Sequence, residues 1–243
     1  MKKLQANKKW IIHQIAVLIQ MKKWKIGLLM AFTLANSTLL LSGCGKAANN
    51  ADHLAQIREN GKIIIAMEGQ WAPWTYHDET GELVGYDTEV GKAIASKLGV
   101  EAEFVEGEWD GLFAGLDGGR YDAIINGVEI TEERAQKYDF SEPYAYIKTA
   151  LVVADTNTEI TKFEDLAGKK TSNSLGSTYA DLAAEYGASV ENVDTLSETI
   201  DMITSGRVDA TLNAEVSFYD YLAEHPDAPI KIVALTEDAS HVS

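Results

Sequence analysis

Residues 121–144 read YDAIINGVEITEERAQKYDFSEPY, an apolar run followed by a charged run. The apolar run follows the Gly118-Gly119 turn and is typical of a β-strand at 121–125. Thr131 is a residue that often caps a helix N-terminus, so it predicts a helix that extends to Tyr138. A strand and a helix are therefore expected in direct succession.

The same alternation extends in both directions from this segment. Strands are expected at 62–67, 102–105, 150–154, after Gly168, and at 189–193, 210–213 and 230–235. Helices are expected at 87–98, capped by Asp87 and stopped by Gly99, and at 110–116, 163–166, 178–186, 197–205 and 214–224. Such alternation predicts an α/β fold with largely parallel sheets. Because the pattern restarts near residue 146, we expect two lobes with a ligand site between them.

The composition excludes several classes of partner. The formal net charge is −16 with an isoelectric point near 4.7, so nucleic-acid phosphates would be repelled. The acidic residues are scattered rather than gathered in one run, which indicates a solvated surface. No histidine pair has metal-ligand spacing and no Gly-x-Ser-x-Gly motif is present, so we expect no metal, no cofactor and no nucleophilic hydrolase.

The N-terminus has the pattern of an export signal. Three lysines within 22–25 precede an apolar stretch at 26–41, which is short for a membrane span. The following Leu-Ser-Gly-Cys resembles the lipobox of bacterial lipoproteins, and Cys44 is the only cysteine. We expect a signal peptide at 1–43 with a true start at Met21. A lipidated N-terminus and tether would follow at 44–60, anchoring an extracytoplasmic protein to the cell membrane.

Short motifs lie in a fixed order along the rest of the chain. They are WAPWTY (71–76), GYD (85–87), WDGL (109–112), DAIINGVEITEER (122–134), YDFSEPY (138–144), FEDLAGKK (163–170), LGST (175–178) and GRVDA (206–210). From residue 61 onward the chain resembles the polar amino-acid family of periplasmic-type solute-binding proteins. The resemblance implies two lobes joined by two hinge strands, closing on one amino acid that is passed to the permease and ATPase of an ABC importer.

The resemblance also implies the limits of the lobes. Lobe one is expected at 61–145, lobe two at 146–236, and the start of a second hinge crossing at 237–243. The family continues beyond the position of Ser243 with segments that return to lobe one. We therefore expect a C-terminally truncated monomer in which lobe one is incomplete.

The predicted site contains groups for each part of an amino acid. Arg134 is expected to bind the carboxylate through its planar guanidinium, although a surface ion pair with neighbouring glutamates is the simpler reading. Ser177 and Thr178 would hold the same carboxylate at a helix N-terminus, or serve only as a cap. Trp71 and Trp109 match positions of aromatic walls, although such residues more often belong to the core.

Acidic residues are expected to bind the ammonium group and the side chain of the ligand. Glu68 matches a position that meets a polar or cationic ligand side chain. The acid that usually binds the ligand ammonium is replaced by Ala214, whereas Glu129 stands where a small residue is usual. We infer that Glu129 supplies the missing charge, with the Gly127 carbonyl as a second acceptor. Ser174 and Asn213 complete the predicted set.

Two other functions share features with this prediction. Cyclohexadienyl dehydratases share the fold and use carboxylates in the same cleft, so Glu129 or Glu68 would be the acid of an enzyme. A sensor ectodomain is the third class, and the lipobox argues against it. Cystine, glutamine and cationic amino acids all stay open as ligands.

Overall fold

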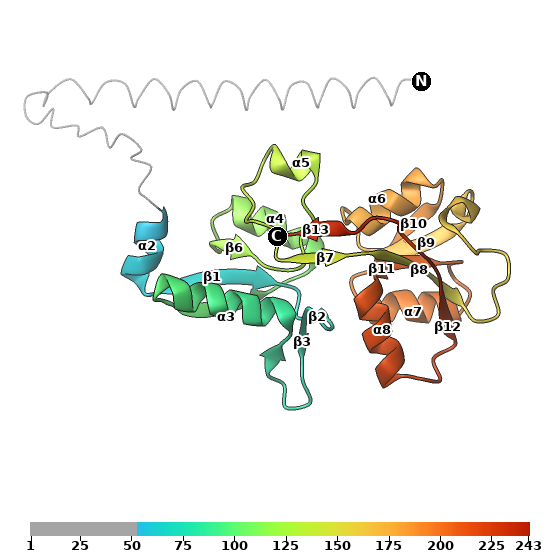
Figure 1. Cartoon of the computed structure of the whole chain (residues 1–243), viewed down its shortest axis with the longest axis horizontal. Coiled ribbons are helices and arrows are strands. Elements are labelled where there is room, and N and C mark those ends of the chain that lie inside the picture. The colour runs from blue at the N-terminus through green and yellow to red at the C-terminus, as the bar shows by residue number, and fades with distance from the viewer. Residues whose placement is uncertain (1–52) are drawn as a thin grey trace, which may run out of the picture. The chain divides into compact units, whose positions relative to one another are not determined.

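The computed structural model describes residues 53–243 (Figure 1). The predicted signal peptide and Cys44 lie outside these residues. Within them, no helix combines the length and the apolar character that a bilayer crossing requires.

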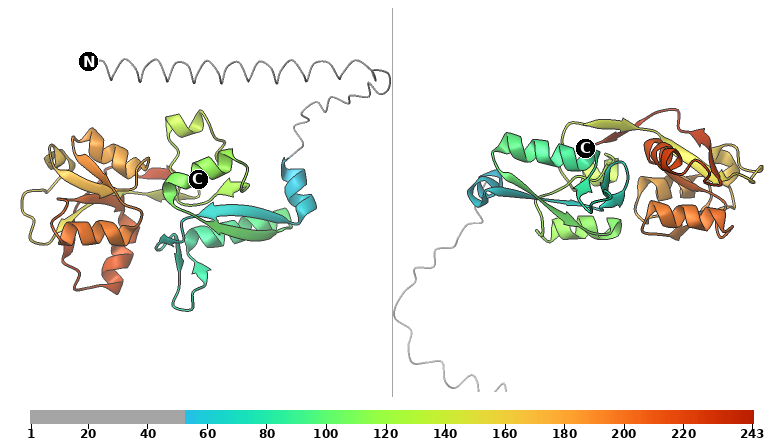
Figure 2. Two further views of the ribbon diagram at one scale, coloured as in Figure 1. Left: turned by 180° about the vertical axis from the view of Figure 1, so that it is seen from behind. Right: turned by 90° about the horizontal axis from the view of Figure 1, so that it is seen from below.

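Lobe one is built on a parallel sheet with strand order β5-β1-β6. Its strands are β1 (Lys62–Met67), β5 (Glu101–Glu106) and β6 (Ala123–Ile124). Side chains alternate across a strand, so Ile63 and Ile65 pack with α3 (Tyr86–Leu98) while Ala66 packs with α4 (Trp109–Asp117). The two helices thus cover opposite faces of the sheet (Figure 2).

Two parts of lobe one were not predicted. Helix α2 (His53–Asn60) occupies the described part of the expected tether. Strands β2 (Gln70–Trp71), β3 (Thr75–His77) and β4 (Leu83–Val84) form a small antiparallel sheet. Strands of two or three residues are too short to show a periodic pattern, which explains why they were missed.

Lobe two is centred on β8 (Thr149–Ala154), whose residues are almost completely buried. Strands β11 (Thr211–Ala214) and β12 (Ile230–Leu235) flank β8, and both run antiparallel to it. The expectation of largely parallel sheets is wrong here, because alternation along the chain does not show the direction in which β8 enters the lobe. β9 (Lys170–Asn173) and β10 (Ser189–Asn192) pair in parallel, and Thr171 and Ala210 form an isolated parallel bridge.

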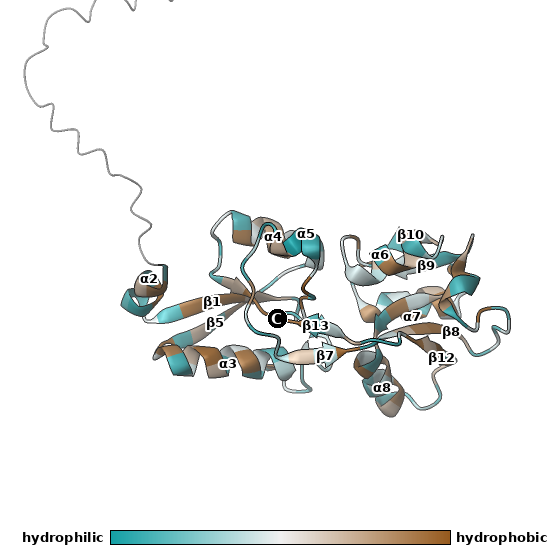
Figure 3. Ribbon diagram, turned by 45° about the horizontal axis from the view of Figure 1, so that its top comes forward, coloured by the Kyte–Doolittle hydropathy of each residue, from teal (hydrophilic) through white to brown (hydrophobic). Residues whose placement is uncertain are grey.

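Helices cover both sides of lobe two. They are η1 (Phe163–Leu166), α6 (Thr178–Glu185), α7 (Leu196–Thr204) and α8 (Glu215–Glu224). Leu151 and Val153 of β8 belong to one apolar cluster, while Ala150 and Val152 belong to a second that includes Phe218. Figure 3 shows the apolar residues concentrated on β8 and on β1. The predicted α/β fold with two lobes is confirmed.

Two antiparallel strands connect the lobes. They are β7 (Ala145–Ile147) and β13 (Ser240–Val242), which run side by side in Figure 1. The Tyr144 N–H donates to the Val242 carbonyl at 3.0 Å, and the Ser243 N–H donates to the Val128 carbonyl at 3.0 Å. The first bond lies within the hinge, and the second joins the hinge to the segment before α5 (Glu132–Ala135).

Asp87 does not cap α3. The N-cap is Gly85, at φ 124°, where an added Cβ would lie 2.3 Å from the Trp74 carbonyl oxygen. Asp87 is instead completely buried, and the Tyr144 hydroxyl donates to its Oδ1 at 2.9 Å. The wrong prediction of the cap has a tertiary cause. Gly85 is required at the N-cap because the backbone of Trp74 approaches it closely, and the local sequence does not show that contact.

Candidate functional site

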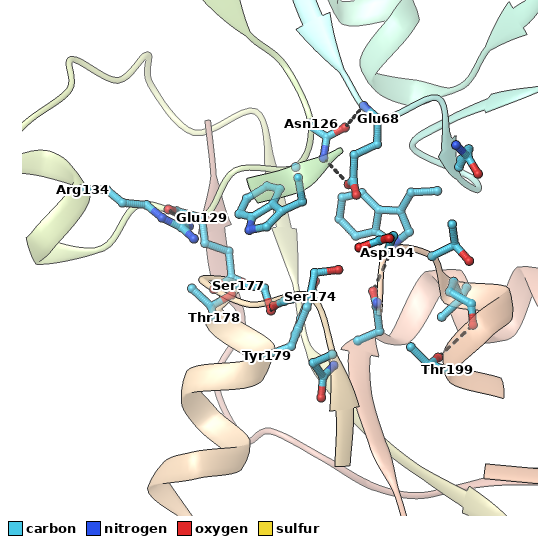
Figure 4. A pocket seen from close by; sticks show the side chains of 18 residues that line it. Glu68, Asn126, Glu129, Arg134, Ser174, Ser177, Thr178, Tyr179, Asp194 and Thr199 are labelled. Carbon is cyan, nitrogen blue, oxygen red and sulfur yellow. Dashed lines mark hydrogen bonds between the residues drawn. The ribbon is translucent and has the colours of Figure 1, made fainter. Parts of the chain in front are cut away.

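A pocket lies between the two lobes and is lined from both (Figure 4). All ten predicted site residues line it: Glu68, Trp71, Trp109, Gly127, Glu129, Arg134, Ser174, Ser177, Thr178 and Asn213. The cavity measures about 50 Å³, room for only a few waters.

Glu68 and Asn126 meet because they follow neighbouring parallel strands. Glu68 comes directly after β1, Asn126 follows β6, and the carboxyl ends of the two strands share one edge. Asn126 is completely buried; its Oδ1 accepts from the Glu68 N–H at 2.8 Å, and its Nδ2 donates to Glu68 Oε2 at 2.6 Å. Burial is the main cause that raises the pKa of Glu68 to about 7, while the hydrogen bond from Asn126 opposes it.

Arg134 extends from α5 across the cleft. Its guanidinium donates to the Glu129 carbonyl at 2.9 Å and, across to lobe two, to the Gly176 carbonyl at 2.9 Å. It also lies over the rings of Trp109 and Phe113, at 5.2 and 5.4 Å from their centroids. These contacts hold its planar face in place and leave N–H groups for a ligand.

Glu129 is a buried carboxylate beside Arg134. It is 8% exposed, and its Oε1 has no hydrogen-bond partner among residues 53–243. Burial raises the pKa of Glu129, and hydrogen bonds with Thr178 and Ser240 act against that rise. An unpartnered buried carboxylate oxygen that faces a pocket is suited to accept from a ligand ammonium.

The N-terminus of α6 faces the same part of the pocket. Ser177 is its N-cap, and the Ser177 Oγ accepts from the Ala180 N–H at 3.1 Å. The hydroxyl of Ser177 also donates to the Ser174 carbonyl at 2.6 Å. Ser177 is thus a helix cap that also lines the pocket, and its predicted contact with a ligand carboxylate stays a prediction.

Trp71 is both a core residue and a wall of the pocket. It is 8% exposed, stacks on Trp74 at 5.6 Å, and its Nε1 donates to Asn213 Oδ1 at 3.0 Å. Gly127, at φ +54°, makes room for the ring, because an added Cβ would lie 2.7 Å from it. Ala214 lies in the same apolar cluster as Trp71, completely buried, and is not among the pocket residues.

Eight further residues line the pocket and were not predicted: Gln70, Asn126, Asn173, Tyr179, Asp194, Thr195, Leu196 and Thr199. Two signals could have found some of them. Asn126 and Asn173 are polar residues at the carboxyl ends of strands, and Thr195 is the N-cap of α7 in a capping box with Glu198.

The pocket has two polar ends, which we name the first and second poles. Arg134, Glu129, Ser177 and Thr178 form the first pole on one side of Figure 4. Glu68, Asn126, Asp194 and Thr199 form the second pole on the other side. Each pole has at least one carboxylate, and each lies where a helix of lobe two begins, α6 at the first and α7 at the second. A molecule with charged groups at both ends fits this arrangement.

Comparison with known proteins gives consistent results. Residues 63–185 match a family model described as bacterial extracellular solute-binding proteins, family 3. A probable amino-acid ABC transporter-binding protein of Haemophilus influenzae is 35% identical over 205 residues, covering 84% of this chain and 79% of the relative. The L-cystine-binding protein TcyA of Bacillus subtilis is 36% identical over 221 residues, covering 87% and 81%. A solved ancestral arginine-binding protein bound to arginine is 38% identical with a TM-score of 0.68, covering 75% and 84%.

Proposed function

The chain belongs to the bacterial extracellular solute-binding proteins of family 3, and from the charged groups at both poles of its pocket we propose that its cleft binds L-cystine. It is an extracytoplasmic amino-acid-binding component of an ABC importer. Its relatives are named as binding proteins, so binding is favoured over the dehydratase alternative.

The two poles of the pocket support L-cystine as the ligand. L-Cystine has two amino-acid heads joined by a disulfide, so each end brings one ammonium and one carboxylate. At the first pole, Arg134 and the N-terminus of α6 would hold a carboxylate, and Glu129 an ammonium. At the second pole, Glu68 and Asp194 would hold the other ammonium, and the N-terminus of α7 the other carboxylate.

Other amino acids would satisfy this pocket less completely. L-Arginine has a cation for Glu68 but no second carboxylate for the N-terminus of α7. L-Glutamine has neither a second cation nor a second anion, and would leave a raised-pKa carboxyl without a charged partner. The presence of acids at both poles is the observation that carries the proposal.

Isothermal titration calorimetry with L-cystine, L-arginine, L-glutamine and L-cysteine tests this assignment. L-Cystine is expected to bind most tightly, and L-cysteine, which offers one head, about 100-fold more weakly, or about 2.7 kcal/mol. Tighter binding of L-arginine or L-glutamine would show that the second pole does not recognise a second amino-acid head.

We also propose that Cys44 takes up a lipid that anchors the protein to the membrane. The lipid is attached when the signal peptide, assigned to 1–43 with its true start at Met21, is removed. The protein is proposed to act as a monomer, with lobes at 61–145 and 146–236 and a second hinge crossing at 237–243. Cys44→Ala is expected to release the protein from the membrane fraction or leave it unprocessed. Unchanged membrane association and mobility of this variant would contradict lipidation.

A further inference from the structure

Asn126 makes two hydrogen bonds to the same residue. Its Oδ1 accepts from the backbone N–H of Glu68, and its Nδ2 donates to the side chain of Glu68. The backbone contact fixes the orientation of the amide, because only the oxygen can accept from an N–H. The NH₂ group must therefore point at the Glu68 carboxyl group, where it favours the ionised form, which only accepts hydrogen bonds.

From this geometry we propose that Asn126 is a positioning residue that holds Glu68 against the pocket as a receptor for a ligand's cationic group, whose binding expels a proton from Glu68. The proton leaves the carboxyl group for the solvent as the carboxylate pairs with the ligand cation, and no bond in the ligand changes. This inference rests on the proposed binding of an amino acid in the cleft.

The surroundings of Glu68 favour the coupling of a proton to ligand binding. The titratable residues around it are Glu106 with its partner His77, Glu108 ahead of α4, and the pocket residues Glu129, Arg134, Tyr179 and Asp194. Burial and the charge of Glu108 raise the pKa of Glu68 to about 7, against the hydrogen bond from Asn126. In the unliganded protein Glu68 is thus mostly protonated at pH 6 and mostly ionised at pH 8.

Calorimetry of the full chain with L-cystine in buffers of different ionisation enthalpy counts the protons released on binding. At pH 6 about 0.9 proton per ligand is expected, and at pH 7.5 about 0.2, from a pKa of about 7. At pH 6 the ligand ammonium groups are almost fully protonated, because α-amino groups titrate at about 7.7–8.0, so the proton count at pH 6 reports Glu68 without a contribution from the ligand. Glu68→Gln is expected to abolish this release.

Asn126→Asp tests the positioning role. The aspartate keeps an acceptor for the Glu68 N–H but replaces the donor with a second carboxyl group, which raises the pKa of Glu68. Affinity at pH 6 is expected to fall about tenfold or more, and proton release at pH 7.5 to rise. In the Glu68→Gln background, Asn126→Asp should no longer change the pH dependence.

Asn157→Asp is the matched control. Asn157 Oδ1 also accepts from backbone N–H groups, those of Glu159 and Ile160, at 2.9 and 3.0 Å, but it lies in an exposed loop outside the pocket. This variant should match the wild type in affinity and proton count. An Asn126→Asp variant that binds equally weakly at each pH, with an unchanged proton count, would reduce Asn126 to a structural residue and overturn the inference.

A ligand-free measurement separates this inference from the proposed function. The pKa of the Glu68 carboxyl group can be followed by ¹³C NMR in the unliganded wild type and in Asn126→Asp. A rise of about one unit or more in the variant supports the coupling, and no rise overturns it. If neither L-cystine nor L-arginine binds the wild type, the proposed function fails while the NMR titration still decides the role of Asn126.

Discussion

At the scale of single residues, the charges that line the pocket are unbalanced. Arg134 is the only Lys, Arg or His among the described pocket residues, whereas Glu68, Glu129 and Asp194 are acidic. The guanidinium donates hydrogen bonds to the backbone carbonyls of Glu129 and Gly176, and its other N–H groups can donate to a ligand carboxylate. Loss of the Arg134 charge should therefore weaken contacts with a ligand carboxylate, whereas loss of an acidic charge should weaken contacts with a ligand ammonium.

Replacing Arg134 with alanine is expected to weaken L-cystine binding by two orders of magnitude or more. Removing one partner of a desolvated charge pair costs about 3–5 kcal/mol, because the other charge stays buried without compensation. Calorimetry on Arg134→Ala, beside a control in which the exposed Arg207 is changed to alanine, gives the measurement. A loss of less than about threefold, under 1 kcal/mol, would remove Arg134 from the binding site.

Glu129→Gln should separate binding from stability. The glutamine keeps the shape of the side chain but loses the negative charge, so affinity for a ligand ammonium should fall at least about tenfold. The melting temperature should hold or rise, because the variant removes a buried carboxylate oxygen that lacks a partner. Glu164→Gln, at an exposed position, serves as control. Unchanged affinity together with a lower melting temperature would show that Glu129 has a structural role only.

At the scale of elements, the site depends on short segments that follow strands and precede helices. Gly127 lies between β6 and α5, with its backbone in the left-handed region beneath the ring of Trp71. The ring in turn contacts Asn213 of β11 in the other lobe. The position of this segment therefore sets the contact between the lobes.

Gly127→Ala is expected to destabilise the protein and weaken binding. A non-glycine residue in the left-handed region costs about 1–2 kcal/mol, and here the new Cβ would also meet Trp71 at 2.7 Å. Gly119→Ala provides a matched control, since Gly119 has φ +66° and open space around it. Thermal melts and calorimetry should show a larger loss for Gly127→Ala. Equal losses for the two variants would mean that the contact with Trp71 is relieved without cost.

At the scale of the whole molecule, lobe one is tied to the hinge through a buried acid. Asp87 of α3 accepts from the hydroxyl of Tyr144, the residue directly before hinge strand β7. Burial is the main cause that raises the pKa of Asp87 to about 7, against hydrogen bonds from Tyr144 and Gly127. The folded protein therefore binds a proton at pH values where the unfolded chain has lost it.

This proton predicts that stability falls as the pH rises. The contribution of Asp87 is fully present below its unfolded pKa near 3.8 and is lost as the pH passes about 7. Thermal melts should give a lower melting temperature at pH 7.5 than at pH 5, and Asp87→Asn should reduce that difference. Repulsion among the excess acidic charges acts in the same direction. Asp227→Asn, which removes an exposed charge, is therefore the control. If both variants leave the same pH dependence, Asp87 does not carry the effect.

Local chemistry explains what the sequence alone determined. The end of α3 at Gly99, the cap of α5 at Thr131 and the start of α6 after Ser177 were predicted correctly, because caps and glycine stops act within a few residues. The order of the motifs predicted the family and the two-lobed fold, both now established. All ten predicted site residues line one pocket, and their roles in binding stay predictions.

Only the tertiary structure decided which residues meet across long separations. Glu68 and Asn126 are 58 positions apart, and their pairing depends on the register of β1 against β6. The antiparallel direction of β8 and the burial of Asp87 under Tyr144 likewise depend on how the hinge enters each lobe. Hydrophobic periodicity reports which face of an element is buried but not which partner buries it. For that reason the sequence alone predicted the walls of the pocket, whereas the hydrogen bonds that orient Glu68 within it required the folded chain.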